Sequence, residues 1–110
     1  MGRSKDPRFK DKDTEQFYLG ERVLKFQEIS RSDKQEARRK VVIIYQAKSW
    51  SEITMYFPYD DKGSNLEKLG KDQHSIRLSK KWRLVFRWDK EKNLSYDVWI
   101  NPHDKSYGKK

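Results

Sequence analysis

Two arginines and a histidine near the C-terminal end of the chain have side chains that can act on a phosphodiester. Arg77 and Arg83 flank a short polar segment, Ser79-Lys80-Lys81, and His103 lies further along. A guanidinium presents forked donors that match phosphate oxygens. An imidazole titrates near neutral pH and can give or take a proton at a phosphate. These residue types predict acid–base chemistry at a phosphate, with cations to stabilise the negative charge.

The elements that position these residues are predicted by the pattern of Gln73–His103, which indicates three consecutive antiparallel strands. A turn at Ser79-Lys80-Lys81 sets Leu78 opposite Trp82 and Arg77 opposite Arg83, with Trp99 beside Arg83 on the third strand. Facing like charges are destabilising, so we expect this pair to hold an anion. One face of the sheet is apolar, with Ile76, Leu78, Trp82, Leu84, Phe86, Trp88, Leu94, Tyr96, Val98 and Ile100.

The other face is predicted to be open and basic. It carries Ser75, Arg77, Ser79, Arg83, Val85, Arg87, Ser95, Asp97 and Trp99. Arginines and an indole on which a base can stack form a plausible platform for single-stranded RNA. Asp97 opposes this by adding a negative charge and can pair with Arg87. A solvated face kept soluble by arginine remains the alternative.

The two histidines are assigned different roles. Extending the strand register places His103 near Ser79–Lys81, close to the arginine pair, where it is a candidate acid or base. His74 falls on the apolar face and is expected to be structural. The two are far apart in sequence, and no carboxylate and histidine set has the spacing of a zinc or magnesium motif. We therefore expect no metal and no cofactor.

Two helices are predicted before the strands. The first begins near Asp13, with Asp13 or Thr14 as the cap and a stripe of Phe17, Val23, Leu24 and Phe26 that Gly20 interrupts. The second begins at a capping box of Ser32 and Gln35 and ends near Trp50 and Ile53, with Ala37, Val41, Ile44 and Tyr45 at helical spacing. Arg8-Phe9-Lys10 can form a short edge strand. Met55–Ser64 and Leu66–Asp72, which carries Lys68 and Lys71, are expected to be loop.

Composition bounds the fold and the partners. The 110 residues carry 26 Lys and Arg against 17 Asp and Glu, a net charge of +9, which favours nucleic acid as a partner, then an acidic protein, then an anionic membrane surface. There is no cysteine, no apolar run that could span a bilayer and no signal-peptide core, so we expect a cytoplasmic protein. We expect a single α+β domain over 1–110, with polar tails at about 1–8 and 104–110.

The strand motifs resemble the HigB-type toxins of the RelE/ParE superfamily, which are ribosome-dependent mRNA interferases of toxin–antitoxin systems. The resemblance is carried by Ser75–Leu78, Trp82–Trp88, Tyr96–Val98 and the closing His103. Upstream support comes from Phe9–Lys12 with Thr14-Glu15, from Arg39-Lys40 with Ala47–Ile53, and from Leu66–Gly70. The chain departs from the family at Asn101-Pro102-His103, where Asp-Tyr often precedes the histidine, and Tyr107 is a candidate substitute.

The resemblance implies a RelE-like fold with a short N-terminal strand and two helices packed on one face of a three-strand antiparallel meander. It implies mRNA cleavage in the ribosomal A site and neutralisation by a helix-turn-helix antitoxin of the HigA type. The lack of a metal motif predicts that this cleavage is metal-independent. The resemblance implies functional roles for Arg83 and His103 and for a loop lysine, which matches Lys68 or Lys71. Together with the strand pattern, it gives His103, Arg83, Arg77 and Lys68 as candidate catalytic residues. The candidate RNA-binding residues are Lys71, Lys80, Lys81, Arg87 and Trp99. A gyrase-binding toxin of the same superfamily and a basic RNA-binding module remain alternatives.

Overall fold

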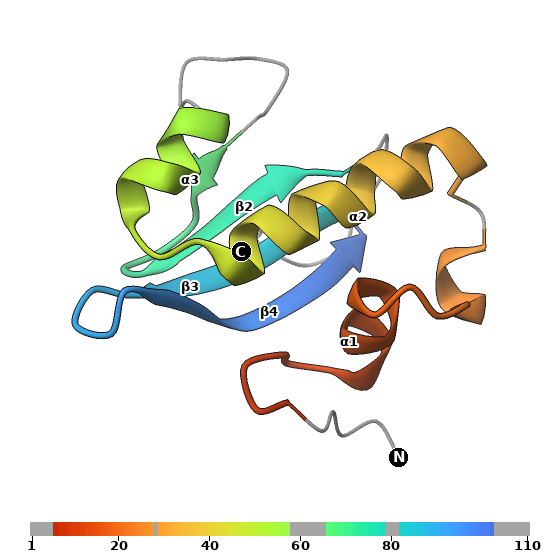
Figure 1. The fold of residues 1–110 in the computed structure, drawn as a ribbon, viewed down its shortest axis with the longest axis horizontal. Helices are drawn as coiled ribbons and strands as arrows, with labels where there is room; N and C mark the ends of the chain where they lie inside the picture. Colours follow the sequence, from red (N-terminus) through yellow and green to blue (C-terminus); the bar gives the residue numbers. More distant parts are fainter. Residues whose placement is uncertain (1–5, 28, 58–65, 79–81, 103–110) are drawn as a thin grey trace.

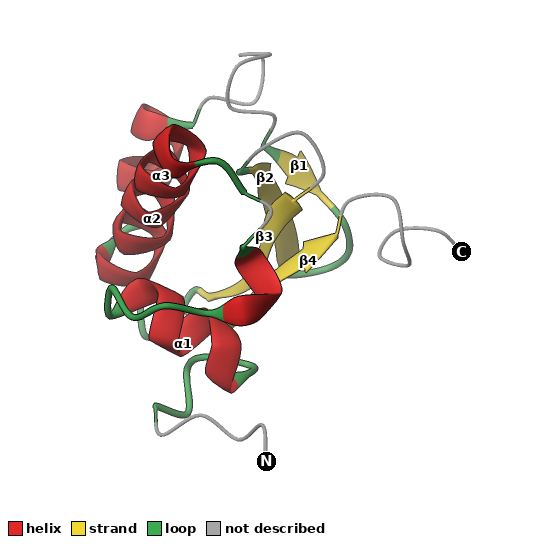
Figure 2. Cartoon of the chain, turned by 90° about the vertical axis from the view of Figure 1, so that its right-hand side faces the viewer, coloured by secondary structure: helices red, strands yellow, loops and turns green. Residues whose placement is uncertain are grey.

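The chain folds into two layers, helices on one side and an antiparallel sheet on the other (Figures 1 and 2). The structure is a computed structural model, and it describes residues 6–27, 29–57, 66–78 and 82–102. The elements are α1 (Lys12–Tyr18), a 3-10 turn η1 (Leu24–Phe26), α2 (Arg31–Gln46), α3 (Trp50–Tyr56), β1 (Glu67–Lys68), β2 (Gln73–Arg77), β3 (Trp82–Asp89) and β4 (Leu94–Pro102). The α+β class is confirmed.

The first helix begins earlier and ends sooner than predicted. Asp11 is its N-cap and accepts a hydrogen bond from the Thr14 N–H, so the predicted caps Asp13 and Thr14 are wrong. Thr14 instead faces the sheet, where its hydroxyl accepts from the Ile100 N–H at 3.0 Å. The helix stops before Gly20, whose φ of 88° lies in the left-handed region that glycine adopts without strain.

The predicted second helix is two helices. Its N-cap is Ser30 rather than Ser32, and α2 ends at Gln46 because Ala47 is extended. Ser49 then caps α3 by accepting from the Glu52 N–H, and the Glu52 carboxylate accepts from the Lys48 N–H. The Ser49-x-x-Glu52 spacing is that of a capping box, a signal that the apolar stripe obscured.

The sheet confirms the predicted meander and adds one strand to it. Its order is β1-β2-β3-β4, and all neighbours are antiparallel. Strand β1 pairs Glu67 with Ser75 and Lys68 with His74, so the expectation of a loop throughout Leu66–Asp72 is wrong. The predicted pairing of Arg77 with Arg83 is present, and the Leu78 N–H donates to the Trp82 carbonyl.

A bulge in β4 changes which residues face the helices. Asp97 has a φ of 50°, and the pairing of β3 with β4 shifts between Val85 and Arg87. Beyond the bulge, Tyr96 pairs with Arg87 and Ser95 pairs with Trp88. Ser95 is buried, and its hydroxyl donates to the Ile44 carbonyl at 3.0 Å. The predicted faces of Leu94, Ser95 and Tyr96 are therefore reversed.

The core lies between the sheet and the helices. Ala37, Val41 and Ile44 of α2 are completely buried against the apolar face of the sheet, as are Ile76, Leu84, Phe86, Val98 and Ile100. Burial of this kind contributes about 25 cal/mol per Å² of apolar surface and accounts for most of the stability of the fold.

The N-terminal segment lies against β4 and α2. The predicted edge strand is reduced to one parallel bridge, Phe9 with Val98, where the Lys10 N–H donates to Val98 and the Val98 N–H donates to Arg8. Asp6 accepts a hydrogen bond from the Tyr45 hydroxyl. Among the described residues, no helix is both long and apolar enough to cross a membrane.

Candidate functional site

The arginine pair lies in the expected register, but the face that carries it is not open. Arg83 is only 3% exposed, and Ser75 and Val85 are completely buried. The Arg83 guanidinium donates to the Ser75 hydroxyl at 3.3 Å and lies 3.6 Å from the Glu67 carboxylate. Arg77, across the strand pair, is exposed. The prediction of a solvent-exposed Arg83 is therefore wrong.

The carboxylate of Glu67 changes how the facing arginines are interpreted. A carboxylate beside a guanidinium favours its charged state and offsets repulsion from a second cation. The partner of Arg83 thus comes from within the chain, so the pair alone does not require an external anion. Because Glu67 lies in a segment expected to be loop, the sequence pattern offered no way to bring it opposite Ser75.

Lys40 is a second contact of the pair that sequence reasoning missed. Its ammonium donates to the Arg77 carbonyl at 2.9 Å, and burial, partly offset by the charge of Glu36, lowers its pKa from the usual lysine value. Lys40 follows Ala37 by three residues and precedes Ile44 by four, a spacing that places it at the edge of the buried helix face. That spacing is the signal that could have found it.

Trp99 lies further from the pair than predicted. Asn101, not Trp99, is opposite Arg83, and Trp99 is opposite Val85. The Lys10 ammonium lies 4.4 Å from the centre of the Trp99 ring, a cation–π contact. This face therefore presents a tryptophan already covered by a lysine of the same chain.

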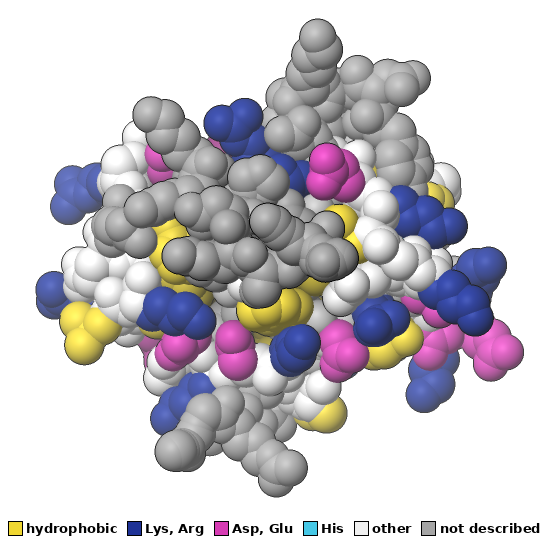
Figure 3. All heavy atoms as spheres, turned by 180° about the vertical axis from the view of Figure 1, so that it is seen from behind, with side chains coloured by type: hydrophobic (Ala, Val, Ile, Leu, Met, Phe, Trp, Pro, Cys, Tyr) yellow, Lys and Arg dark blue, Asp and Glu magenta, His cyan; other side chains and the backbone are white. Residues whose placement is uncertain are grey.

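The predicted pairing of Arg87 with Asp97 is present, with 3.6 Å between the guanidinium and the carboxylate. Both side chains are partly exposed, so the pair contributes little to stability. On the side of the molecule opposite α2, the visible basic side chains are interspersed with acidic ones (Figure 3). Among the described side chains visible there, positive charge is thus not segregated from negative charge.

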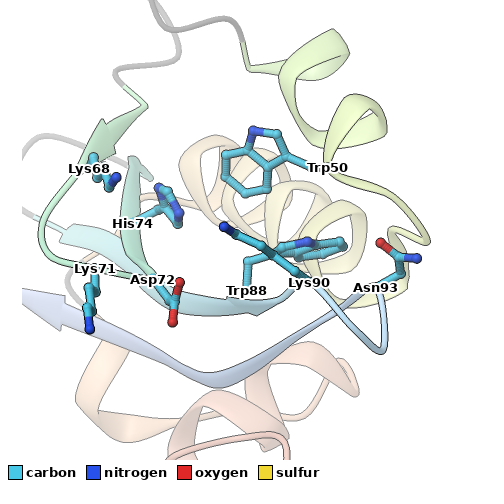
Figure 4. Close-up of a pocket in the computed structure, with 8 residues that line it drawn as sticks. All are labelled: Trp50, Lys68, Lys71, Asp72, His74, Trp88, Lys90 and Asn93. Carbon is cyan, nitrogen blue, oxygen red and sulfur yellow. The ribbon is translucent and has the colours of Figure 1, made fainter.

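Lys68 and Lys71 lie apart from the arginine pair. Since Glu67 pairs with Ser75 and Lys68 with His74, alternation puts Glu67 on the arginine face and Lys68 on the helix face. Lys68 and Lys71 line a hollow of about 390 Å³ at the β1 end of the sheet (Figure 4). Its other lining residues are Trp50, Asp72, His74, Trp88, Lys90 and Asn93.

His74 is on the helix face, as predicted. It is buried, and its ring centre lies 4.5 Å from that of Trp50 and 5.7 Å from that of Phe86. Burial, assisted by the charge of Lys68, lowers the pKa of His74 below its usual value, so the imidazole is neutral at pH 7. Its Nδ1 has no hydrogen-bond partner among the described residues.

Three predicted site residues, His103, Lys80 and Lys81, lie outside the described residues. Among the described residues, the structure brings Arg77 and Arg83 together with Ser75, Glu67 and Lys40, and it places a lysine-lined hollow apart from them. Within the described part of the chain, no three histidine or carboxylate side chains are grouped so that they could hold a metal ion.

Comparison with known proteins assigns the chain to a family. Residues 7–103 match the family model described as the RelE-like toxin of the type II toxin–antitoxin system HigB. A search of curated proteins gives no match. The matched region contains the four strands and three helices that the structure describes, together with the facing arginines. The chain therefore belongs to the HigB-type family of RelE-like toxins, the toxin components of type II toxin–antitoxin systems.

Proposed function

We propose that the chain is an mRNA endonuclease that acts on the ribosome and thereby inhibits translation, and that a helix-turn-helix antitoxin of the HigA type neutralises it. The family match carries this proposal, because it spans the facing arginines and reaches His103. An exposed Arg77 directly across from the buried guanidinium of Arg83 supports it, since Arg77 can contact a phosphate while Arg83 adds positive charge beside it.

In the proposed reaction, the 2′-oxygen of one nucleotide forms a bond to the adjacent phosphorus. The bond from that phosphorus to the 5′-oxygen of the next nucleotide breaks. A base takes the proton of the 2′-hydroxyl, and an acid gives a proton to the departing 5′-oxygen. His103 is the candidate for one of these two roles.

The cations are assigned according to their exposure. Arg77 contacts the phosphate directly, and the buried Arg83, held by Ser75 and Glu67, adds positive charge that stabilises the pentacovalent phosphate. Lys68 is opposite His74 rather than beside the arginines. This position favours a role for Lys68 in holding the RNA over a role at the scissile phosphate.

The test is inducible expression of the full chain and of the Arg77→Gln, Arg83→Gln and His103→Ala variants, followed by mapping of mRNA ends. Arg31→Gln is the matched control, because it removes an exposed arginine at the start of α2. We expect codon-phased cuts from the wild-type and control chains. Each site variant should lose about a hundredfold in cleavage rate. Thermal melting of the purified Arg83→Gln variant separates loss of function from loss of fold.

The possible outcomes separate the candidate functions. Folded Arg83→Gln and His103→Ala variants that still cleave mRNA at the wild-type rate would show that the site is assigned wrongly. Intact mRNA together with DNA-damage signalling would identify a gyrase-binding toxin instead. If expression causes no growth arrest, a basic RNA-binding module is the remaining candidate function.

A further inference from the structure

The hollow at the β1 end of the sheet has a wall of three aromatic rings from three different elements. Trp50 comes from α3, His74 from β2 and Trp88 from β3 (Figure 4). The Trp50 ring centre lies 4.5 Å from that of His74 and 5.7 Å from that of Trp88. His74 and Trp88 are each less than a tenth exposed. The wall is therefore fixed by packing, with Trp50 as its partly exposed member.

Lysines surround this aromatic wall. Lys68 on β1, Lys71 in the following turn and Lys90 after β3 all line the hollow, against one carboxylate from Asp72. In Figure 4 the ends of Lys68 and Lys90 lie toward the rings. None of the three lysines forms an ion pair with another described residue. As far as the described residues are concerned, their positive charge is thus available to a ligand.

Aromatic rings beside ammonium groups match the chemistry of a nucleotide, which has a planar base and an anionic phosphate. Stacking on aromatic side chains and contact with basic groups is how proteins hold single-stranded nucleic acid. The volume of about 390 Å³ falls in the range of pockets that hold small ligands or parts of larger ones.

We propose that this hollow binds one nucleotide of single-stranded RNA away from the scissile position. Its base would lie against Trp50, and its phosphate would lie among Lys68, Lys71 and Lys90. The inference rests on the proposed function for its source of RNA. It adds to that function a second contact, remote from the facing arginines.

The strand geometry sets the path between the two sites. His74 and Arg77 are three residues apart on β2, about 10 Å along a strand, and alternation puts them on opposite faces. Because β1 is the edge strand on this side, an RNA bound at both sites passes over β1. The hollow therefore fixes where the RNA leaves the sheet, and it contributes to binding rather than to the chemical step.

Lys90 provides the sharpest test, because a matched lysine lies on the same turn. Lys92 is exposed and does not line the hollow, so Lys92→Gln removes the same charge from the same turn as Lys90→Gln. The probe is a fluorescein-labelled 2′-O-methyl RNA octamer, which lacks the attacking hydroxyl and cannot be cleaved. Its binding to the purified full chain is followed by anisotropy over a series of salt concentrations.

We expect Lys90→Gln to weaken binding about tenfold, the loss typical of one hydrogen bond to a charged group. The slope of log K against log salt should fall by about 0.7, as for one lost contact with a single-stranded phosphate. Lys92→Gln should leave both quantities unchanged. Trp50→Leu should weaken binding more than Trp50→Phe, which keeps a ring on which a base can stack.

Equal affinities and equal salt slopes for Lys90→Gln and Lys92→Gln would overturn the proposal, as would a wild-type chain that does not bind the octamer. A hollow that prefers an oligoglutamate peptide to the octamer would instead be a site for an acidic protein. Cleavage of mRNA in a translation extract is measured separately. If the chain cleaves mRNA but the two lysine variants bind the octamer equally well, the proposed nucleotide site is refuted and the endonuclease is not. If the two variants differ in binding but the chain does not cleave mRNA, the endonuclease is refuted and the nucleotide site is not.

Discussion

His74 is buried, is neutral at pH 7 and is influenced by the positive charge of Lys68. Its ring is packed between Trp50 and Phe86, and the charge of Lys68 acts on it in the same direction as burial. Asp72 acts in the opposite direction. Since burial is the largest cause, protonation of His74 costs more in the folded chain than in the unfolded chain.

This pKa shift predicts how stability depends on pH. The unfolded chain takes up a proton near the ordinary histidine pKa of 6.5, whereas the folded chain does so only at lower pH. The unfolded state therefore binds more protons below about pH 6.5, and the free energy of unfolding falls as the pH is lowered through that range. His74→Phe keeps an aromatic ring but cannot take up a proton, so the free energy of unfolding of this variant should fall less over the same pH range. Urea unfolding at about pH 7.5 and about pH 5.5 measures the difference.

His103 is present in both chains, so its titration cancels when the two are compared. The same pH dependence in the wild-type and His74→Phe chains would show that the folded environment does not resist protonation of His74.

At this scale, the sequence allowed the pairing of the arginines to be predicted but not their environment. Alternation assigns Arg83 to a face, but it does not reveal whether that face is covered or which carboxylate reaches it. Glu67 approaches Arg83 only because a two-residue strand pairs with β2, and so short a strand has no periodicity to detect. The predicted position of Trp99 beside Arg83 was wrong for a related reason, because the predicted pairing of β4 with β3 was displaced along the strand.

At the level of the elements, the direction of the side chains in the first part of β4 is set by a single residue. Asp97 adopts left-handed φ, and this extra residue reverses the faces of every residue between it and the β3–β4 turn. It allows Ser95 to point inward, where its hydroxyl reaches the Ile44 carbonyl in the last turn of α2. Carbonyls in the last turn of a helix lack partners within the helix, so the bulge supplies one.

The conformation of Asp97 predicts a contrast between two substitutions. Asp97→Gly removes only the half-exposed ion pair with Arg87 and fits the left-handed φ, so stability should change by less than about 1 kcal/mol. Asp97→Val places a β-branched residue at the same φ and should cost about 1–2 kcal/mol more than Asp97→Gly. Urea unfolding of both variants measures the contrast, and Arg87→Gln isolates the ion pair. Equal stability of the Val and Gly variants would contradict a bulge fixed in this conformation.

The elements themselves were predicted where their apolar pattern was long. The strands β2 and β3 and the body of α2 were predictable because periodic burial marks them. The break between α2 and α3 was not, since Trp50 and Ile53 continue an apolar pattern across an extended Ala47. The bulge escaped prediction because nothing in the alternation of β4 marks Asp97 as an extra residue.

For the whole molecule, Arg8 joins the helical layer to the sheet. Its guanidinium donates to the Ser95 carbonyl and to the Tyr45 carbonyl, both at 2.7 Å, and to the Ser95 hydroxyl at 3.1 Å. It also lies 4.0 Å from the centre of the Tyr45 ring. Tyr45 is in the last turn of α2, where a cation is favourable, and Ser95 is on β4 beyond the bulge.

Loss of Arg8 should therefore destabilise the whole fold rather than only its N-terminal segment. Arg8→Gln leaves the two part-buried carbonyls without the guanidinium and should lower the free energy of unfolding by about 1–3 kcal/mol. Arg8→Lys should recover only part of this loss, because one ammonium cannot span both carbonyls as the planar fork does. Lys12→Gln is the control, since it removes an exposed cation from the start of α1. If urea unfolding places Arg8→Gln and Lys12→Gln at the same stability, the helices and the sheet are held together without Arg8, and the core alone joins the two layers.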